Sequence, residues 1–303
     1  MLPSMIKAMS TVAREQKPRI AIVIPTLNRP RYLDQLLENI SKLPTQPIIT
    51  LIIDASENAY ILNPNERNTK VIASSIRSAA IQRNIGIEYL AKMNLDLDYL
   101  AFLDDDVRVS TDYFQKIHET FKGFPQAVGV SGIAISSSER GIRQNKFWSF
   151  LGLTGEEGVL TSAAINIPVR KATSQVEVDW LIGCSVWKWE IARRLKFQKD
   201  FLGQSVFEDV LFSVEAADFG TLIVNPKIVI EHLLAGEERP NSLNHYRSWV
   251  INRYRLNQVA PERFSLLSFL VVNFIVAIHL VLSARLKGAV GILLGTIRLI
   301  GIK

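Results

Sequence analysis

Three consecutive aspartates, Asp104, Asp105 and Asp106, follow a short apolar run over residues 99–103. The run is too short for a helix and fits a buried strand. In an open α/β sheet, ligands bind beyond the carboxyl ends of the strands, so these carboxylates fall where a ligand would sit. Adjacent carboxylates repel one another unless a positive group joins them, and Mg²⁺ or Mn²⁺ suits oxygen ligands of this kind. The alternative interpretation is an exposed acidic turn that caps a helix beginning near Ser110.

A sheet must position these aspartates, and the first half of the chain alternates apolar strands with amphipathic helices. Asp54 stands at the carboxyl end of the second predicted strand, so it would share one sheet edge with the three aspartates. The alternation predicts a three-layer α/β domain with a mainly parallel central sheet. No glycine-rich dinucleotide fingerprint or P-loop follows the first strand, which argues against nicotinamide or ATP-hydrolysing enzymes. The predicted strands cover residues 19–25, 48–53, 71–73, 99–103 and 127–135, and the predicted helices cover residues 31–43, 78–93 and 110–121.

The second half of the chain places further acids and a histidine at the ends of predicted elements. A helix over residues 207–219 carries Glu208 and Asp209 in its first turn, where acids suit the helix dipole. His232 directly follows two short predicted strands, residues 221–224 and 228–230. Asp209 is therefore either a functional carboxylate or a helix-start acid. His232 is either a metal ligand or a hydrogen-bonded core residue.

Composition limits the class of protein. With 303 residues, of which 48% are hydrophobic, the chain can bury a full core. The single cysteine, Cys184, cannot form an internal disulfide, which fits a reducing, cytosolic compartment. After Pro240, eight lysines and arginines face one acid, Glu262, so the net charge of +6 is concentrated in the tail. Because the body of the chain is near neutral, this distribution favours an anionic membrane surface over nucleic acid.

The C-terminal tail contains two apolar runs. Residues 264–284 carry no formally charged side chain and are about long enough to span a bilayer. The second run, residues 288–302, is shorter and is interrupted by Arg298. Polar residues of the first run share one arc of a helix, so a spanning helix, an in-plane helix and burial against the body all stay open. Gly288, Gly291 and Gly295 would share one helix face, which permits close contact with another helix.

With these elements placed, the chain resembles the family-two inverting glycosyltransferases, which share the GT-A fold. The resemblance covers roughly residues 19–259 and lies in the order of several motifs. I-P-T-L-N-R resembles the family's opening nucleotide-site motif, and I-I-D-A-S-E-N resembles the stretch whose aspartate contacts the base. A-A-I-Q-R-N-I-G resembles the A-R-N-x-G helix, and F-L-D-D-D-V resembles the D-x-D signature. The resemblance implies a nucleotide-sugar site formed by Pro25, Thr26, Asn28, Arg29, Asp54, Arg83, Asp104 and Asp105.

The downstream part of the resemblance concerns the base, the metal and the acceptor. F-E-D-V-L-F-S-V-E-A-A-D-F-G resembles the family's E-D helix, whose aspartate is the usual base and corresponds here to Asp209. This base would take a proton from an acceptor hydroxyl during a single, inverting displacement. Mg²⁺ or Mn²⁺ would be held by Asp106 and by His232, which stands where many members carry a histidine. The predicted acceptor contacts are Gly183, Trp187 and Glu208, with core packing as the alternative for the tryptophan.

The predicted organisation is a lead-in over residues 1–17, a GT-A domain over residues 18–260 and a hydrophobic membrane-associated tail over residues 261–303. The nucleotide half covers about residues 18–135 and the acceptor half about residues 136–260. The lead-in lacks the apolar core of a signal peptide, so export is not expected. The predicted acceptor is a lipid-linked glycan, as in assembly of bacterial surface polysaccharide. Its transfer would take place at the cytoplasmic face of the cell membrane, with the protein attached through the tail and no nucleic acid involved.

Two other functions stay open. A haloacid-dehalogenase-type phosphatase would use Asp104 as nucleophile, Asp106 as acid, and Glu208 with Asp209 as metal holders. Its motif normally opens the chain, whereas two strand–helix units precede it here. A non-catalytic, membrane-bound sugar-binding or scaffold protein is the other possibility, and the presence of Asp106 and Asp209 counts against it.

Overall fold

The computed structural model describes residues 17–63, 68–135, 153–199, 206–233 and 243–301. All but the last residue of the expected lead-in lies outside the described residues, as does the first part of the expected acceptor half, residues 136–152. Strands and helices alternate along the first half of the chain, as predicted. In chain order these elements are β1 (Ile20–Thr26), α1 (Pro30–Ser41), β2 (Ile49–Asp54), β3 (Thr69–Ala73), α2 (Ala79–Met93), β4 (Tyr99–Phe102), β5 (Val107–Val109), α3 (Tyr113–Gly123) and β6 (Ala127–Ile135).

The second half of the chain completes the sheet and then becomes helical. The strands and helices that join the body are β7 (Val176–Val178), β8 (Ser185–Lys188), α5 (Trp189–Ala192), α6 (Glu208–Ala217) and β9 (Thr221–His232). The helices that follow are α7 (Leu243–Tyr254), α8 (Leu256–Val259), a 3-10 turn at Pro261–Arg263, α9 (Leu266–Leu282) and α10 (Leu286–Ile300). The two short strands expected around Pro226 are one continuous strand, β9, because its pairing with β6 shifts register there and so tolerates the proline.

The sheet of the described residues is mixed, which corrects the expectation of a mainly parallel one. Its nine strands run in the order β3-β2-β1-β4-β8-β6-β9-β5, and β7 also pairs with β9. β1, β2, β3 and β4 pair in parallel, as do β6 and β9. β8 lies antiparallel between β4 and β6, and β5 and β7 lie antiparallel to β9. Within the described residues, β5 follows β4 and β8 follows β7 without an intervening helix, and antiparallel pairing needs none.

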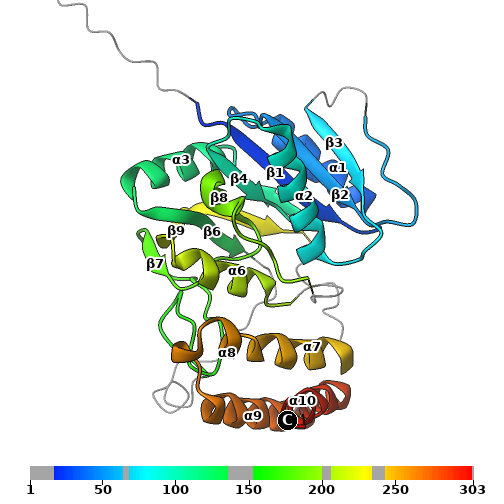
Figure 1. Ribbon diagram of the computed structural model, residues 1–303, viewed down its shortest axis with the longest axis vertical. Helices are drawn as coiled ribbons and strands as arrows, with labels where there is room; N and C mark the ends of the chain where they lie inside the picture. Colours follow the sequence, from blue (N-terminus) through cyan, green and yellow to red (C-terminus); the bar gives the residue numbers. More distant parts are fainter. Residues whose placement is uncertain (1–16, 64–67, 136–152, 200–205, 234–242, 302–303) are drawn as a thin grey trace, which may run out of the picture.

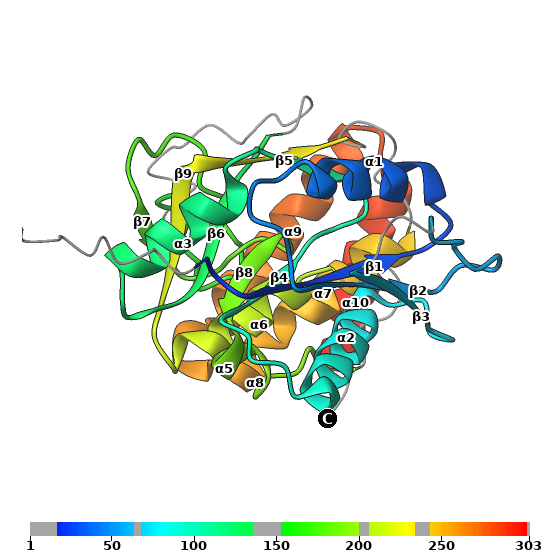
Figure 2. The same ribbon diagram turned by 90° about the horizontal axis from the view of Figure 1, so that it is seen from above.

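Helices cover both faces of the sheet (Figure 1). On one face, α1 and α3 bury apolar side chains such as Leu33, Leu36 and Ile117. The amphipathic helix predicted over residues 31–43 is thereby confirmed, with Leu33, Leu36, Leu37 and Ile40 all buried. On the other face, α2 and α6 pack through a second core, and Figure 2 shows the two helix layers on opposite sides of the strands.

The C-terminal helix pair, α9 and α10, forms a further layer beneath α7 and α8 (Figure 1). Gly288, Gly291 and Gly295 of α10 all face α7, so the predicted shared glycine face is confirmed. A Cβ on Gly291 would lie 2.4 Å from the carbonyl oxygen of Leu243, which explains why only glycine fits there. Across residues 17–301, excluding the undescribed gaps, no helix combines the length and apolar character required to traverse a membrane.

A buried arginine ties this helix pair to the body. Arg253 of α7 is fully buried, and its Nη1 donates to Asn273 Oδ1 of α9 at 2.9 Å. Its Nε donates to the carbonyl oxygen of Ala164 at 3.0 Å, and its Nη2 donates to that of Ala163. Burial lowers the pKa of Arg253 to about 9, so its guanidinium remains protonated at neutral pH. One side chain therefore joins α7, α9 and the loop that carries Ala163 and Ala164.

Candidate active site

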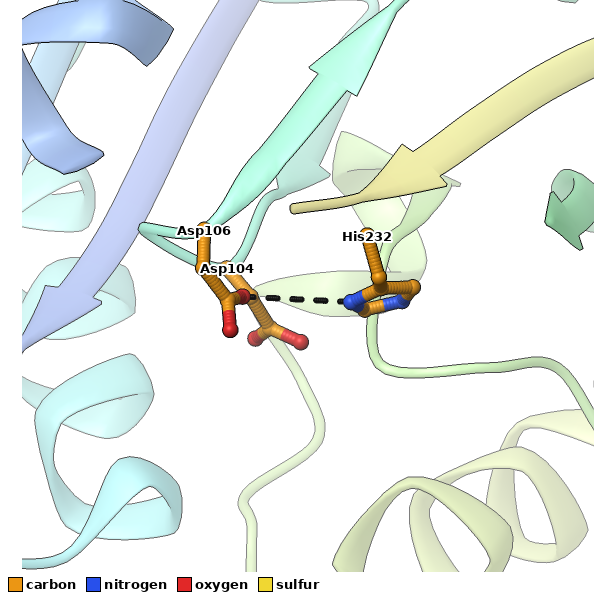
Figure 3. A group of neighbouring side chains, drawn as sticks. All are labelled: Asp104, Asp106 and His232. Atoms are coloured by element: carbon orange, nitrogen blue, oxygen red, sulfur yellow. Dashed lines mark ion pairs between the residues drawn. The ribbon is translucent and has the colours of Figure 1, made fainter. Parts of the chain in front are cut away.

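Two carboxylates and an imidazole converge at one edge of the sheet (Figure 3). Asp104 and Asp106 follow β4, and His232 is the last residue of β9. β5 pairs with β9 so that His232 lies opposite Val107, the residue after Asp106. One ligand atom from each of Asp104, Asp106 and His232 lies within 4.8 Å of the others, and His232 Nδ1 is 3.8 Å from Asp106 Oδ1. The structure therefore brings together residues that are far apart in the sequence.

The chemistry of this group fits a divalent cation. All three side chains are partly exposed, so an ion could reach them and still bind a further ligand. Burial acts to raise the pKa of Asp106, but the hydrogen bond and charge of His232, together with the charge of Arg29, hold it below its ordinary value. An ionised carboxylate at neutral pH is what a hard cation such as Mn²⁺ or Mg²⁺ requires, and imidazole is compatible with Mn²⁺.

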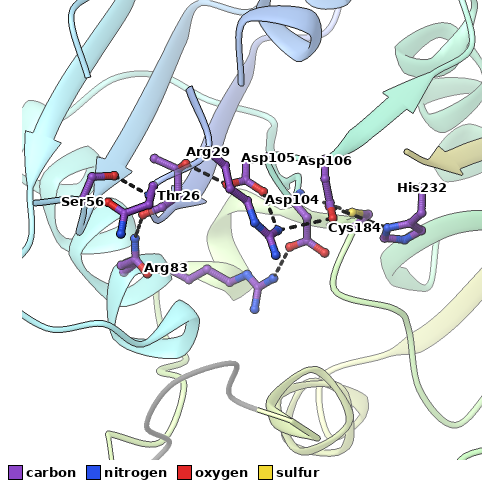
Figure 4. A network of polar contacts seen from close by, with 11 residues as sticks. Thr26, Arg29, Ser56, Arg83, Asp104, Asp105, Asp106, Cys184 and His232 are labelled. Atoms are coloured by element: carbon purple, nitrogen blue, oxygen red, sulfur yellow. Dashed lines mark hydrogen bonds and ion pairs between the residues drawn. The ribbon is translucent and has the colours of Figure 1, made fainter. Parts of the chain in front are cut away.

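The middle aspartate is separate from this group. Asp105 is 4% exposed, and its Oδ2 accepts a hydrogen bond from Thr26 Oγ1 at 2.7 Å. Its Oδ1 accepts one from Arg29 Nη1 at 3.2 Å (Figure 4). Burial raises the pKa of Asp105 to about 6, while Thr26 and Arg29 oppose that shift. Asp105 therefore fastens the acidic turn to the end of β1, and Arg29, which also contacts Asp106 at 3.4 Å, adds a positive charge beside the metal group.

Arg83 connects the acidic turn to α6. This α2 residue is 2% exposed, and its Nη2 donates to Asp104 Oδ1 at 2.8 Å. Its Nη1 donates to Glu208 Oε1 at 2.5 Å. Burial alone would lower the pKa of Arg83, but the charges of Asp104 and Glu208 raise it instead. A Cβ on Gly183 would lie 3.0 Å from Arg83 Nη2 and 3.7 Å from Asp104 Oδ2, so the glycine leaves room beside this contact.

Asp209 lies in the first turn of α6, next to Glu208. Burial raises the pKa of Asp209 to about 6, with the Asp104 charge adding to the rise and the Arg83 charge opposing it. The carboxylate is thus within electrostatic reach of the acidic turn. Its Oδ1 also accepts a hydrogen bond from the backbone N–H of Val210 at 2.9 Å, which steadies the helix start. Asp209 is adjacent in sequence to Glu208, which pairs with Arg83, and Arg83 also contacts Asp104 of the metal group.

Several predicted nucleotide contacts are occupied by bonds within the fold. The carboxylate of Asp54 accepts the N–H groups of Ser56 at 2.9 Å and Tyr60 at 2.7 Å, so it caps the loop that follows β2. Asn28 has a positive φ of 54°. Its N–H donates to Ser56 Oγ, and its Oδ1 accepts the N–H of Glu57. Pro25 is buried within β1 opposite Ile53. These residues shape the edge of the sheet beside the metal group.

Trp187 does not reach this site, which corrects its assignment as an acceptor contact. The residue is 2% exposed in β8, and its ring packs edge-on against Phe212 of α6 at 4.9 Å between centroids. Its Nε1 donates to Ser185 Oγ at 2.8 Å. The core-packing alternative holds because the side chains of a strand alternate between faces, and that of Trp187 faces the α2 and α6 layer.

Sequence reasoning missed two residues that support the site. Gln82, buried on α2, donates from Nε2 to the carbonyl oxygens of Thr26 and Ile53, joining the ends of β1 and β2. Cys184, which is buried, accepts a hydrogen bond at Sγ from the backbone N–H of Asp104 at 3.3 Å. Burial raises the pKa of this thiol. Hydrophobic periodicity gives no signal for a buried glutamine, although Gln82 adjoins the motif that pointed to Arg83.

Comparison with known families now defines the class of protein. Residues 21–182, more than half of the chain, match the family model "Glycosyl transferase family 2". The chain belongs to glycosyltransferase family 2. A search of curated proteins gives no match.

Solved structures show the same GT-A fold. GalNAc-T7, solved with UDP, GalNAc and Mn²⁺, aligns with a TM-score of 0.60 and 15% identity over 81% of this chain and 48% of its own. TarS from S. aureus aligns with a TM-score of 0.51 and 12% identity, and the alignment covers 86% of this chain and 43% of TarS. The mannosyltransferase PcManGT from Pyrobaculum calidifontis was solved with GDP-Man and Mn²⁺ and aligns with a TM-score of 0.52 and 15% identity. The alignment covers 94% of this chain and 76% of PcManGT. The chain thus spans under half the length of the first two.

Proposed function

We propose that the chain transfers a sugar from a nucleoside-diphosphate donor to an acceptor hydroxyl, with inversion at the anomeric carbon and with Mg²⁺ or Mn²⁺ as cofactor. The observation that carries this proposal is the convergence of Asp104, Asp106 and His232 beside Arg83, which also pairs with Glu208, the neighbour of Asp209 in sequence. GalNAc-T7 and PcManGT, solved with UDP and with GDP-Man respectively, each with Mn²⁺, support the donor class.

The donor side is formed by the acidic turn and its cations. Asp106 and His232 would hold the divalent ion, with Asp104 in support. When bound, that ion neutralises the negative charge that develops on a leaving diphosphate. Arg29, whose side chain is 42% exposed, presents a second positive charge at the rim of the same site. An arginine in this position suits bidentate contact with phosphate oxygens.

The acceptor side is formed by the start of α6. Asp209 accepts the proton of the acceptor hydroxyl as that oxygen attacks the anomeric carbon. A pKa raised to about 6 makes this carboxylate a better general base near neutral pH than an ordinary aspartate. Glu208, bonded to Arg83, holds the helix start in place. Gly183 keeps the space beside Arg83 and Asp104 open for a ligand.

We further propose a lipid-linked glycan as the acceptor, in assembly of bacterial surface polysaccharide at the cytoplasmic face of the cell membrane. Support comes from the C-terminal helix pair, which exposes large apolar side chains together with cations. The phosphatase alternative loses its basis because Glu208 and Asp209 begin a helix and do not end a strand. The scaffold alternative differs from the transferase because a scaffold would not turn over a sugar donor, and one experiment distinguishes the two.

That experiment is calorimetric titration of UDP, GDP, dTDP and CDP into the protein, with and without Mn²⁺. The transferase proposal expects metal-dependent binding of one diphosphate. Asp106→Ala should abolish it, whereas Asp112→Ala, which removes a more exposed carboxylate near the same turn, should not. With the matching sugar nucleotide, NMR of the product should show the opposite anomeric configuration to that of the donor. Absence of binding by all four nucleotides would contradict the proposal, and binding without turnover of any sugar donor would favour the scaffold.

A further inference from the structure

The C-terminal helix pair has one buried face and one exposed face on each helix. The side of α9 that packs inward carries Phe269, Val272, Asn273, Ala277 and Leu280. In α10 the glycine face packs on α7, with Ala289 and Ile292 buried beside it. The opposite sides of both helices are open to solvent. A surface helix normally carries polar side chains on its solvent-facing side, so the residue types on this open side indicate whether the surface binds a partner.

The open side is apolar. On α9, Leu267, Phe274 and Leu282 are 75%, 64% and 81% exposed, and Ile278 is exposed beside them. These positions recur at helical spacing and so form one stripe. α10 continues the pattern with an exposed row formed by Leu286, Val290, Leu293, Leu294 and Ile297. Because the two helices pack against each other as an outer layer (Figure 1), the rows lie on neighbouring helices and form a patch that a soluble surface rarely leaves uncovered.

Cations accompany this patch and acids do not. Arg285 directly precedes α10, Lys287 lies in the first turn of α10, and Arg298 lies near its end. No aspartate or glutamate occurs after Glu262 in the sequence. The charge complements anionic headgroups, which attract basic residues at a membrane surface. A second copy of this chain is a poorer partner, because a symmetric contact would bring the same cations of both copies together.

We propose that the exposed face of α9 and α10 is an in-plane docking surface for an anionic lipid bilayer. The apolar rows enter the boundary between headgroups and acyl chains, to a depth of about 5–10 Å, while Arg285, Lys287 and Arg298 remain at headgroup level. Both helices keep their packing on α7 and on the loop held by Arg253, so the body stays outside the bilayer. The docking surface rests on this packing and not on the proposed sugar transfer.

If the protein docks in this way, the orientation of its body determines from which side a lipid-linked acceptor reaches the active site. This part of the inference rests on the proposed function. α7 and α8 lie between the helix pair and α6 (Figure 1). Asn252 Nδ2 of α7 donates to the carbonyl oxygen of Val206 at 2.9 Å, close to Asp209 in sequence. The bilayer therefore lies on the side of the sheet that carries α6. An acceptor head group held at that membrane surface approaches the proposed base and not the α1 and α3 layer.

The test is vesicle flotation of the full chain. Binding is expected to phosphatidylcholine vesicles that contain phosphatidylglycerol, and to be much weaker without it. An apolar-face variant that combines four substitutions should weaken vesicle binding by about tenfold or more. These substitutions are Leu267→Ser, Phe274→Ser, Leu282→Ser and Leu293→Ser. A matched variant, Ile61→Ser with Phe219→Ser, removes exposed apolar side chains of the body and should bind like the parent. Replacing Arg285, Lys287 and Arg298 by glutamine should weaken vesicle binding by about fivefold for each residue replaced.

Three outcomes would overturn the docking surface. The first is that the parent protein does not float with the vesicles, and the second is that the parent and the apolar-face variant float equally. The third is that the parent forms a dimer without lipid in ultracentrifugation and the apolar-face variant is a monomer. Nitroxides on Phe274→Cys and Leu293→Cys, attached selectively because Cys184 is buried, should both report a shallow depth. A bilayer-centre depth for either label would contradict in-plane docking. Circular dichroism of every variant shows whether it is folded, independently of nucleotide binding, so failure of lipid binding is distinguishable from failure of the transferase proposal.

Discussion

Arg83 and Glu208, which are 125 positions apart in the sequence, form an ion pair of 2.5 Å. Their side chains are 2% and 9% exposed, so the pair is shielded from water. The same guanidinium contacts Asp104 at 2.8 Å. One arginine of α2 therefore sets the separation between the acidic turn, which carries the metal group, and the first turn of α6, which carries Asp209. The two sides of the proposed reaction depend on this contact for their relative position.

Removing that arginine should destabilise the fold. Arg83→Met would leave Glu208 and Asp104 without their partner in a poorly hydrated site, which typically costs about 3–5 kcal/mol. Urea denaturation followed by circular dichroism measures the loss. Arg77→Met is the matched control, because its pair with Glu57 is exposed (54% and 71% for the two side chains) and such pairs contribute about 1 kcal/mol or less. Equal losses for both variants would show that the Arg83 contacts do not stabilise the fold.

The proposed base has a direct test. Asp209→Asn keeps the size of the side chain but removes its ability to accept a proton, so turnover should fall by about 10²- to 10⁴-fold. Donor affinity should stay near that of the parent, because the metal group is untouched. Asp218→Asn, at the exposed C-terminal end of the same helix, should turn over like the parent. Steady-state kinetics with the sugar nucleotide identified by calorimetry separates these results, and an active Asp209→Asn enzyme would exclude this residue as the base.

The rate should depend on pH through the same carboxylate. Burial raises the pKa of Asp209 to about 6, and only the deprotonated form accepts a proton. kcat/KM should therefore be constant at neutral pH and fall as the pH drops through about 6. An ordinary aspartate would sustain the rate to about pH 4. The pH profile of kcat/KM, measured with circular dichroism at each pH to confirm folding, distinguishes the two midpoints.

The metal group should lose affinity when its imidazole is removed. His232→Gln deletes the nitrogen ligand and should weaken Mn²⁺ binding by about 10- to 100-fold. Titration of Mn²⁺ followed by electron paramagnetic resonance gives the affinity directly. His279→Gln changes an exposed histidine of α9 and serves as the control. Unchanged Mn²⁺ affinity in His232→Gln would remove the histidine from the ligand set and leave the aspartates alone.

The packing of α10 on α7 can be tested with one methyl group. A Cβ on Gly291 would lie 2.4 Å from a backbone oxygen, so Gly291→Ala should lower the free energy of unfolding by about 1–3 kcal/mol. Gly123→Ala, in α3, adds the same group where no atom lies within 4 Å. That variant should be neutral or up to about 1 kcal/mol more stable, because alanine favours a helix. Thermal denaturation of both variants gives the comparison, and a tolerated Gly291→Ala would contradict the close packing.

Much of the fold could be predicted because its signals are local. The apolar spacing of α1, the short run of β4 and the glycine face of α10 each reflect the period of one element. The metal group follows from two element ends: Asp104 and Asp106 come directly after β4, and His232 ends β9. The general rule that ligands bind at strand ends placed the aspartates at the binding edge, and the family resemblance added His232 to them.

Other features of the site depend on tertiary competition for polar groups, which sequence does not reveal. Asp54 stands at the predicted sheet edge, but its oxygens accept two backbone N–H groups of the following loop. Asp105 differs from its neighbours only in the direction of its side chain, which Thr26 and Arg29 determine. The antiparallel insertion of β8 was missed because four residues carry too little pattern to indicate a strand. Its Trp187 was misassigned for the same reason, since the face of a strand cannot be told before its register is known.

The pairing of β5 with β9 limits how this chain can change. His232 lies opposite Val107, and the N–H of Leu233 donates to the carbonyl oxygen of Asp106 at 2.8 Å. A shift of one residue would place Glu231 or Leu233 opposite Val107 and turn the new side chain to the other face of the sheet. Many substitutions along β9 leave that register intact, whereas the loss or gain of a single residue before His232 removes the imidazole from the aspartates. Length, more than sequence, is therefore the constrained property of this strand.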